Sequence, residues 1–376
     1  MPSGSGPRPS RGLCTLACRK RIEMTRHATI GLFTVSCALL HGTPSAFAVE
    51  TEQIPTDRGT VPLYLPTDLD PDVDIPLVIS LHGYTGNGNQ HENYFNLRSR
   101  IDEDRFMLCV PNGTTDSQGS RFWNATDFCC DFENRNPDDS GYLRDLIETI
   151  TANYSIDVGS IHVVGHSNGG FMAYRMACDH ADLIASIASL AGATYANTSD
   201  CTPSEPVHAL QIHGTADDVI RYAGQCIPFI FCYPGAMESV ETWAQYDGCS
   251  SVEENGPPID LDGSIPGAET SRVILADGCD QQGSAELWRI EGGSHGPSFN
   301  GNFARELVGW LLEHDRSPDE VPCAADVNAD GIVNGGDLSL MLATWGTASE
   351  ACDIDQDGIV GGGDLSLVLA TWGACP

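Results

Sequence analysis

The chain has 376 residues, with 19 basic and 52 acidic side chains and a formal net charge of −33 at pH 7. Such a surface repels nucleic acid and anionic membranes, so neither is an expected partner. Hydrophobic residues make up 41% of the chain and the mean hydropathy is −0.16, values typical of a globular protein with one large domain and a smaller one.

Residues 1–48 have the pattern of a signal peptide. Arg26 precedes a mostly apolar run at 28–40, and Ala-Phe-Ala at 46–48 is the small-x-small pattern that a signal peptidase cleaves. The run of about 13 residues is shorter than the roughly 20 that cross a bilayer. Met24 is a second candidate start. We therefore expect an exported protein without a membrane span; the alternative, a buried N-terminal helix, lacks capping residues.

The cysteines agree with export. Three of the 15 cysteines lie in the predicted signal peptide, and an even number remains, as expected for disulfides. The remaining cysteines form two groups. One lies between Cys109 and Cys279, and the other, in the tail, is Cys323, Cys352 and Cys375. Each group has an odd number of cysteines, so either one bridge joins the two groups or each group keeps a free thiol. Cys109 is predicted to be a buried free thiol on a strand. The adjacent Cys129 and Cys130 are predicted to pair with two separate partners.

From Pro76 onward, apolar runs of strand length alternate with helical patterns, which predicts a mostly parallel sheet covered by helices. The predicted strands are 76–82, 105–111, 160–165, 185–190, 208–213 and 286–291. The predicted helices are 142–154, 171–178, 237–246 and 303–314. An α/β catalytic domain is therefore expected over residues 49–315.

The segment HGYTG at 82–86 directly follows the first of these strands. In α/β-hydrolase geometry, the loop at this place offers a main-chain N–H to a developing oxyanion, and the residue after the nucleophile offers a second. We therefore expect Tyr84 and Asn168 to be the oxyanion donors. A glycine-rich turn is also an ordinary way to leave a strand, so this segment alone is a weak signal.

The segment GHSNG at 165–169 lies between a predicted strand and a predicted helix. The motif G-x-S-x-G needs this setting, because the sharp turn accepts only small flanking residues and lifts the serine hydroxyl clear of the sheet. Ser167 is therefore the candidate nucleophile. Other single histidines, such as His166, are more often structural and receive no role.

Two further loops follow strands and supply an acid and a base. HGTADD at 213–218 carries Asp217, and GGSH at 292–295 carries His295. The chain order Ser, Asp, His is the one expected for α/β-hydrolases. We expect Ser167 to attack an acyl carbon, His295 to transfer its proton, and Asp217 to stabilise the imidazolium, with no cofactor needed for catalysis. Asp218 is the alternative acid, because a shift of one residue in the loop would exchange the two.

Six segments together resemble the polyhydroxybutyrate depolymerase / feruloyl esterase family of secreted α/β-hydrolases over about residues 58–315. They are LHGYTGNG (81–88), FWNATDFCCDF (122–132), DDSGYLRDLI (138–147), VVGHSNGGFMAYRMAC (163–178), HGTADD (213–218) and ELWRIEGGSH (286–295). The resemblance implies an α/β-hydrolase fold, carboxylic ester hydrolysis, a triad of Ser167, Asp217 and His295, and an oxyanion hole at Tyr84 and Asn168. Family members cleave aliphatic polyesters, feruloyl or acetyl groups on polysaccharide, and small esters, so the substrate stays open.

Two features near the predicted site are particular to this chain. Where many family members have an aromatic residue shortly after the catalytic histidine, this chain has Gly-Pro-Ser at 296–298. The apolar, aromatic stretch 226–233 is bracketed by Cys226 and Cys232. It is interpreted either as a stapled flap that grips the acyl group or as a disulfide-held loop packed on the core.

After a polar linker at 316–322, the sequence repeats itself with a period of 27 residues, from Asp326 and again from Asp353. Each repeat has hard oxygen donors at the spacing of a calcium loop, with a glycine at the bend. The expected Ca²⁺ ligands are Asp326, Asn328, Asp330, the carbonyl of Ile332 and Asp337 in the first loop, and Asp353, Asp355, Asp357, the carbonyl of Ile359 and Asp364 in the second. Position 12 is Asp rather than the Glu of an EF-hand.

The duplicated loops, each followed by a helix, resemble a type I dockerin over residues 323–376, a small all-α calcium-binding module. The resemblance implies docking to a cohesin-like or other surface partner. Gly-Gly stands at 335–336 and 362–363, where many dockerins carry Ser-Thr recognition pairs, so the partner is open.

The sequence thus predicts a secreted serine esterase acting on esters of a polymer or oligomer, such as feruloyl or acetyl esters on polysaccharide, and tethered through a calcium-bound module. A polysaccharide substrate is favoured because dockerins usually accompany cell-wall enzymes. The alternatives are a strict polyhydroxybutyrate depolymerase, a serine peptidase, and a non-catalytic surface-binding protein of the same fold.

Overall fold

The computed structural model describes residues 49–227, 231–280 and 283–316, and within the C-terminal part residues 325, 327–328, 332–349, 352–354 and 358–374. The predicted signal peptide and almost all of the predicted linker lie outside the described residues.

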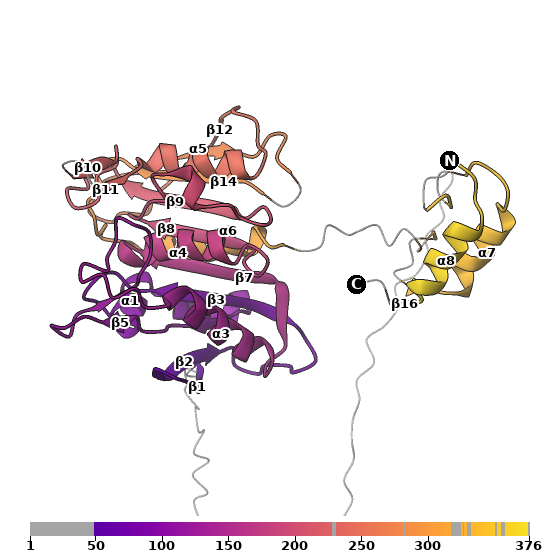
Figure 1. Cartoon of the computed structure of the whole chain (residues 1–376), viewed down its shortest axis with the longest axis horizontal. Helices are drawn as coiled ribbons and strands as arrows, with labels where there is room; N and C mark the ends of the chain where they lie inside the picture. The colour runs from indigo at the N-terminus through magenta and orange to yellow at the C-terminus, as the bar shows by residue number, and fades with distance from the viewer. Residues whose placement is uncertain are drawn as a thin grey trace, which may run out of the picture. The chain divides into compact units, whose positions relative to one another are not determined.

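A ten-stranded mixed sheet forms the centre of the large domain (Figure 1), in the order β1-β2-β4-β3-β7-β8-β9-β14-β13-β12. Its strands are β1 (Glu50–Thr56), β2 (Gly59–Leu65), β3 (Ile75–Leu81), β4 (Met107–Cys109), β7 (Ile156–His166), β8 (Ser186–Leu190), β9 (His208–Gly214), β12 (Glu254–Ile259), β13 (Thr270–Leu275) and β14 (Ala285–Ile290). The six central strands, from β4 to β14, are parallel, and an antiparallel pair closes each side. This is an α/β-hydrolase-like mixed, mostly parallel sheet.

Helices cover both faces of this sheet. The helices of the large domain are α1 (Gly88–Phe95), α2 (Ile101–Asp104), α3 (Asp139–Thr151), α4 (Asn168–Asp179), α5 (Ala236–Tyr246) and α6 (Asn302–Glu313). Buried side chains of α3, α4 and α5 belong to one core, and those of α1, α2 and α6 belong to the other. Among the described residues, no helix is long and apolar enough to cross a bilayer.

The buried strands explain the two-sided core. In β3, Leu77 and Ile79 face one core and Val78 faces the other, and all three are fully buried. Side chains alternate between the two faces of a strand, so a strand buried on both faces reads as a continuous apolar run. This is why the sequence pattern predicted these strands.

All six predicted strands and all four predicted helices are present, as β3, β4, β7, β8, β9, β14 and α3 to α6. The prediction began the third strand at Ser160, whereas β7 already begins at Ile156. Asp157 and Gly159 interrupt the apolar run there, which hid the first part of the strand. The outer antiparallel strands β1, β2, β12 and β13 were not predicted. The two edge strands, β1 and β12, are mostly exposed and have no continuous apolar run.

The disulfides correct one prediction and confirm another. Cys129 and Cys130 pair with each other, not with separate partners. The other pairs are Cys178–Cys201, Cys226–Cys232 and Cys249–Cys279. Within the described large domain, these pairs occupy every cysteine that would have partnered Cys129 or Cys130, except the fully buried Cys109. Cys109 on β4 is a buried free thiol, as predicted.

The described C-terminal elements are β15 (Ile332–Val333), α7 (Gly335–Ala343), α8 (Gly362–Ala370) and β16 (Gly373–Ala374). α7 and α8 begin at equivalent places in the two sequence repeats. Buried Val333 and Met341 of the first repeat share a small core with Val360 and Val368 of the second. The two repeats therefore pack against each other.

For several ionisable groups of the large domain, burial is the largest influence on the pKa. Burial lowers the pKa of His82 and His166 to about 4 and that of His162 to about 3. Burial raises the pKa of Glu92 to about 7 and that of Asp247 to about 8. The buried histidines and the buried acids have opposite effects on how the free energy of unfolding depends on pH.

We expect the free energy of unfolding to be greatest between about pH 6 and pH 7. The histidines have a folded pKa below the unfolded value of about 6.5, so the stability they contribute is lost as the pH falls from about 6.5 towards 4. The two acids have a folded pKa above the unfolded value, so stability is lost as the pH rises through about 4 to 8. Urea unfolding at pH 4 to 9 measures the profile. A flat profile would contradict the burial of these groups.

Candidate active site

The four predicted site loops meet at one edge of the sheet. They follow β3, β7, β9 and β14, which are neighbours and run parallel. The carboxyl ends of parallel strands lie at the same edge, where ligands bind in open α/β sheets. The four predicted site loops, which are far apart in the sequence, therefore lie close together in the fold.

Ser167 lies at a sharp turn between β7 and α4. Its backbone has φ 55° and ψ −119°, a conformation that an L residue rarely adopts. The flanking glycines make this turn sterically feasible. A Cβ on Gly165 would collide with the main chain of Gly169, and a Cβ on Gly169 would collide with the carbonyl of Leu81. The local G-x-S-x-G pattern therefore has a steric cause.

His295 and Asp217 are in direct contact. His295 Nδ1 lies 2.8 Å from Asp217 Oδ2, and Asp217 is buried whereas His295 is partly exposed. Asp218, the alternative acid, is exposed. The difference arises because Asp217 Oδ1 accepts hydrogen bonds from the main-chain N–H groups of Val219 and Ile220, which turn its carboxylate inward.

The carboxylate of Asp217 is held in its charged form. Burial by itself would raise the pKa of Asp217, but hydrogen bonds from His213 and His295 lower it below the ordinary value. His213 Nε2 lies 3.3 Å from Asp217 Oδ2, while its Nδ1 accepts a hydrogen bond from the Gln211 side-chain amide. The same Nε2 lies 2.8 Å from the main-chain carbonyl of Ile220, so its N–H is shared between that carbonyl and the acid. No pattern in the sequence indicated this contact.

The loop of His295 is tied to the loop of Ser167 through His166. His166 Nε2 donates to the main-chain carbonyl of His295 at 2.8 Å, and the two rings are 4.9 Å apart. Burial lowers the pKa of His166 to about 4, so it is neutral at pH 7. Within the described large domain, Ser167 Oγ makes no hydrogen bond, and catalytic hydrogen bonds of a free enzyme often form only in the complex.

The two predicted oxyanion donors lie on either side of Ser167. Asn168 directly follows Ser167 at the N-terminus of α4, where main-chain N–H groups have no helical partner. Tyr84 follows Gly83, and a Cβ on Gly83 would stand 3.4 Å from the Ser167 Cβ. In the described part of the chain, neither main-chain N–H donates a hydrogen bond. Both are therefore free to bind an oxyanion.

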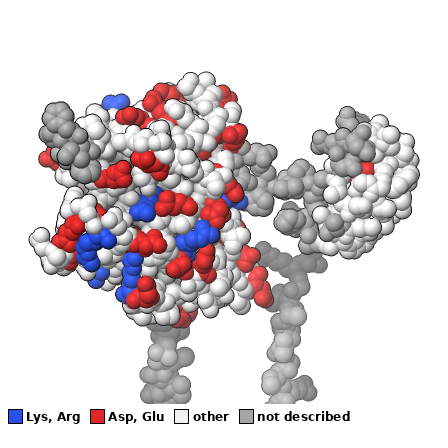
Figure 2. Space-filling model, viewed as in Figure 1, with Lys and Arg blue, Asp and Glu red and all other residues white. Residues whose placement is uncertain are grey.

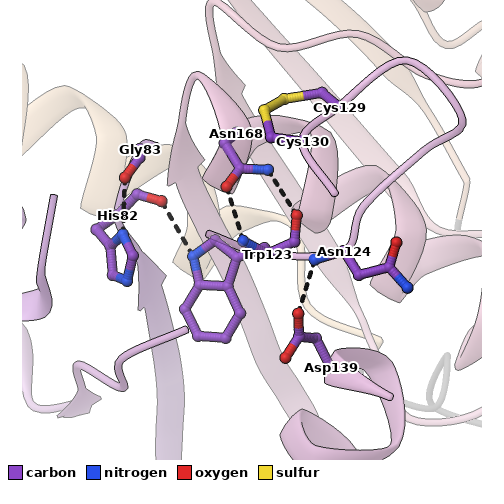
Figure 3. Close-up of a disulfide and its surroundings, with 8 residues drawn as sticks. All are labelled: His82, Gly83, Trp123, Asn124, Cys129, Cys130, Asp139 and Asn168. Atoms are coloured by element: carbon purple, nitrogen blue, oxygen red, sulfur yellow. Dashed lines mark hydrogen bonds between the residues drawn. A yellow bond between two sulfur atoms is a disulfide. The ribbon is translucent and has the colours of Figure 1, made fainter. Parts of the chain in front are cut away.

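Trp123 joins these two donor segments to each other (Figure 3). The Asn168 side chain accepts from the Trp123 N–H at 2.7 Å and donates to the Trp123 carbonyl at 2.8 Å. The Trp123 indole N–H donates to the His82 carbonyl at 3.0 Å. Trp123 and Asn168 are both fully buried. This contact was missed in the sequence, although FWNATDFCCDF was one of the segments that carried the family resemblance.

A buried acid holds the same loop from the other side. Asp139 at the start of α3 accepts from the Asn124 N–H at 2.7 Å (Figure 3) and from Thr114 Oγ1 at 2.8 Å. It also forms an ion pair with Arg58. The main chain of Trp123 is therefore held by Asn168, and that of the next residue, Asn124, is held by Asp139.

Asn168→Ala is expected to destabilise the protein by about 2 to 4 kcal/mol, because it leaves the buried N–H and carbonyl of Trp123 without partners. Urea unfolding measures the loss. Gln118→Ala is the control, because Gln118 is exposed, and it should change the free energy of unfolding by less than about 0.5 kcal/mol. Equal stability of both variants would contradict the contact.

Aromatic side chains lie next to the Gly-Pro-Ser stretch after His295. Tyr94 OH donates to the Pro297 carbonyl at 3.0 Å, and its ring stacks on Phe299 at 5.3 Å. A Cβ on Gly296 would stand 3.8 Å from Tyr94 OH. Tyr94, from α1, therefore packs beside the stretch that follows His295.

The stretch bracketed by Cys226 and Cys232 is a two-stranded hairpin, β10 (Gln225–Ile227) and β11 (Phe231–Tyr233), joined by that disulfide. Its base packs on the core, because Tyr233 is buried and its hydroxyl accepts from the Arg221 N–H at 2.8 Å. Residues 228–230, at the tip, lie outside the described residues.

Figure 2 shows arginines lying among carboxylates on the face in view. Three arginines of the large domain form ion pairs: Arg58 with the buried Asp139, Arg144 with Asp182, and Arg175 with Asp179. These cations are therefore locally neutralised.

Of the ten predicted calcium ligands, Asp326, Asp330, Asp355 and Asp357 lie outside the described residues. Asp337 and Asp364 are fully buried at the starts of α7 and α8. Each accepts main-chain hydrogen bonds from its own loop, for example from the N–H of Asn334 to Asp337 at 2.8 Å. Asp353 Oδ1 is buried without a hydrogen-bond partner in the described residues. Asn328, Ile332 and Ile359 lie in the same loops.

Comparison with known proteins places the chain in a family. Feruloyl esterase B of Piromyces equi is 26% identical over 200 residues, which are 51% of this chain and 36% of that protein. The bifunctional acetylxylan esterase/xylanase of Neocallimastix patriciarum is 27% identical over 160 residues, which are 43% of this chain and 22% of that protein. The chain spans half or less of the length of the first curated relatives it matches.

Among solved structures, an acetyl xylan esterase from Aspergillus awamori is 16% identical with a TM-score of 0.47, covering 69% of this chain and 99% of that chain. The model of the Esterase family matches residues 52–261, more than half of the 376-residue chain. The chain therefore belongs to the Esterase family of carboxylic ester hydrolases.

Proposed function

We propose that this chain is a secreted serine esterase that hydrolyses feruloyl or acetyl esters on polysaccharide through Ser167, His295 and Asp217. The observation that carries the proposal is the contact between His295 Nδ1 and the buried Asp217 carboxylate, at the same sheet edge as the turn that presents Ser167. Family membership supports the reaction class.

In the first half of the reaction, Ser167 Oγ attacks the carbonyl carbon of the ester and His295 Nε2 accepts its proton. The negative Asp217 stabilises the resulting imidazolium and holds the ring with Nδ1 protonated. His295 then gives the proton to the leaving alcohol, and an acyl-enzyme remains.

In the second half, water attacks the acyl-enzyme with His295 as the base, and the acid is released. The main-chain N–H groups of Tyr84 and Asn168 bind the oxyanion in both halves. Trp123 supports this role, because it ties the segments of the two donors together and keeps their spacing constant.

The substrate class rests on similarity. The proteins that this chain resembles are named feruloyl esterases and an acetylxylan esterase. Export through a signal peptide at 1–48 is supported by the four disulfides of the large domain, since such bonds persist in oxidising compartments.

The C-terminal residues 323–376 are proposed to form a dockerin-like module that binds two Ca²⁺ ions and attaches the enzyme to a cohesin-like or other surface partner. Two observations support calcium. Asp337 and Asp364 are buried carboxylates at equivalent loop positions, and the buried Asp353 Oδ1 has no hydrogen-bond partner among the residues that the structure describes. Oxygen donors of this kind suit a hard cation.

A substrate panel tests the proposed function. The mature chain should release acetate from p-nitrophenyl acetate and ferulate or acetate from the corresponding polysaccharide esters, and Ser167→Ala should not. Clearing of a polyhydroxybutyrate film with poor turnover of methyl ferulate would instead favour a depolymerase, and peptide cleavage would favour a peptidase. Equal inactivity of both proteins on every substrate would overturn the catalytic assignment.

Isothermal titration of the metal-free mature chain with Ca²⁺ tests the module. Two sites are expected, and Asp337→Ala and Asp364→Ala should each remove one, because each deletes the last carboxylate of one loop. Asp218→Ala is the control and should keep both, since Asp218 is exposed in the large domain. No heat on Ca²⁺ addition to the unaltered chain would contradict the proposal.

A further inference from the structure

We propose that Tyr84 and Phe132 form a binding platform for an uncharged sugar ring of the polysaccharide chain, beside the nucleophile. This inference rests on the proposed function and names a subsite for the carrier of the ester. The two rings meet edge to face, with centroids 5.4 Å apart. Tyr84 is 37% exposed and Phe132 is 67% exposed, so each keeps a large apolar surface in contact with water.

The platform lies next to the reacting hydroxyl. Tyr84 follows Gly83, whose Cβ position would be only 3.4 Å from the Ser167 Cβ. The loop that carries the Tyr84 ring therefore passes beside the nucleophile. Two exposed aromatic rings in contact on this loop and its neighbour offer an apolar surface to a ligand.

The Tyr84 ring is held in place rather than free to rotate. Its hydroxyl donates to Asp116 Oδ2 at 3.2 Å, and the next residue, Thr85, donates its N–H to the Arg121 carbonyl at 2.8 Å. Asp116 is itself fixed by the N–H groups of Gln118 and Ser120. Little side-chain entropy is lost when a ligand binds such a ring.

The loop of Phe132 is equally constrained. The Phe132 N–H donates to the Cys130 carbonyl at 2.9 Å, directly beside the Cys129–Cys130 disulfide that lies near Asn168 in Figure 3. Asp131 accepts from the Asn136 N–H, and Glu133 accepts from Ser117 on the neighbouring loop. Polar contacts of the neighbouring residues Asp131 and Glu133 thus fix the loop with the apolar Phe132 ring exposed. Burial of that ring would have stabilised the protein more.

The charges on the loops around the two rings favour an uncharged ligand. The loops 115–120 and 131–136 carry three carboxylates, Asp116, Asp131 and Glu133, against one cation, Arg135. A negative ligand, such as an uronic acid, is therefore repelled. The C–H face of a neutral pyranose stacks on an aromatic ring, and its hydroxyls can donate to carboxylates at the rim. A neutral sugar ring fits both features of the platform.

The test compares Phe132→Ala with the unaltered enzyme on acetylated xylo-oligosaccharide and on p-nitrophenyl acetate, which has no sugar. We expect KM for the oligosaccharide to rise about tenfold, which corresponds to about 1.4 kcal/mol, with kcat unchanged. Kinetics on p-nitrophenyl acetate should not change. Phe132→Tyr should restore the oligosaccharide KM. Val158→Ala is the matched control, because Val158 is also 68% exposed but lies on β7.

Binding separates this inference from the proposed function. Calorimetric titration with xylo-oligosaccharide that carries no ester needs no hydrolysis, and Phe132→Ala should weaken binding while Val158→Ala should not. Equal binding by all three proteins would overturn the platform even if ester hydrolysis is observed. A rise in KM confined to methyl ferulate, or tighter binding of a glucuronic acid oligosaccharide, would also overturn the assignment to a neutral sugar.

Discussion

Ser167→Ala is expected to lower kcat/KM on p-nitrophenyl acetate by about 10⁴-fold or more, because no other group can form the acyl-enzyme. Alanine keeps the Cβ and adds no atom, so the turn at φ 55° is retained and the fold should be unchanged. A fluorophosphonate probe should label the unaltered protein at Ser167 and leave the variant unlabelled, as read by mass spectrometry of the peptides.

Ser298→Ala is the matched control for this loss. Ser298 is exposed, lies three residues after His295, and its hydroxyl makes no hydrogen bond in the described chain, so its removal should leave activity unchanged. Retained activity and labelling in Ser167→Ala would show that Ser167 is not the nucleophile.

Asp217→Asn is expected to lower kcat by about 10³- to 10⁴-fold, because the amide would present an N–H to His295 Nδ1 and favour the wrong tautomer of the ring. The amide oxygen can still accept from Val219 and Ile220, so the loop should keep its conformation. The measurement is kcat on p-nitrophenyl acetate, with circular dichroism to check the fold.

Asp218→Asn separates the two neighbouring acids. Asp218 is exposed, so kcat should stay within about twofold of the unaltered enzyme. If Asp218→Asn is the damaging change and Asp217→Asn is tolerated, the acid has been assigned to the wrong residue.

The elements around the site were predictable because their causes are local. A strand buried on both faces, such as β3, must be a continuous apolar run, and the run is visible in the sequence. The turn at Ser167 needs glycine at 165 and 169, because any Cβ would collide with the neighbouring main chain. Steric requirements of this kind act within a few residues, so they leave a short motif.

The contacts that organise the site were not predictable, because they join residues that the sequence separates. Trp123 is 45 residues from Asn168, and Asp139 is 81 residues from Arg58. Each of these polar groups is compatible with many partners, and only the packing of the sheet selects one. The separate partners predicted for Cys129 and Cys130 were wrong for the same reason, since the other cysteines that might have joined them are paired elsewhere in the fold.

The sequence by itself determined the class of fold, the order of the loops that bear Ser167, Asp217 and His295, and the 27-residue repeat, because periodicity and glycine spacing are local properties of a chain. Only the tertiary structure decided which acid meets His295. Burial and two main-chain hydrogen bonds turn Asp217 inward, whereas Asp218, one residue later, faces water. The tertiary structure also brought together Tyr84 and Phe132, which are 48 residues apart in the sequence. Polar contacts within their loops hold the two exposed rings beside the nucleophile.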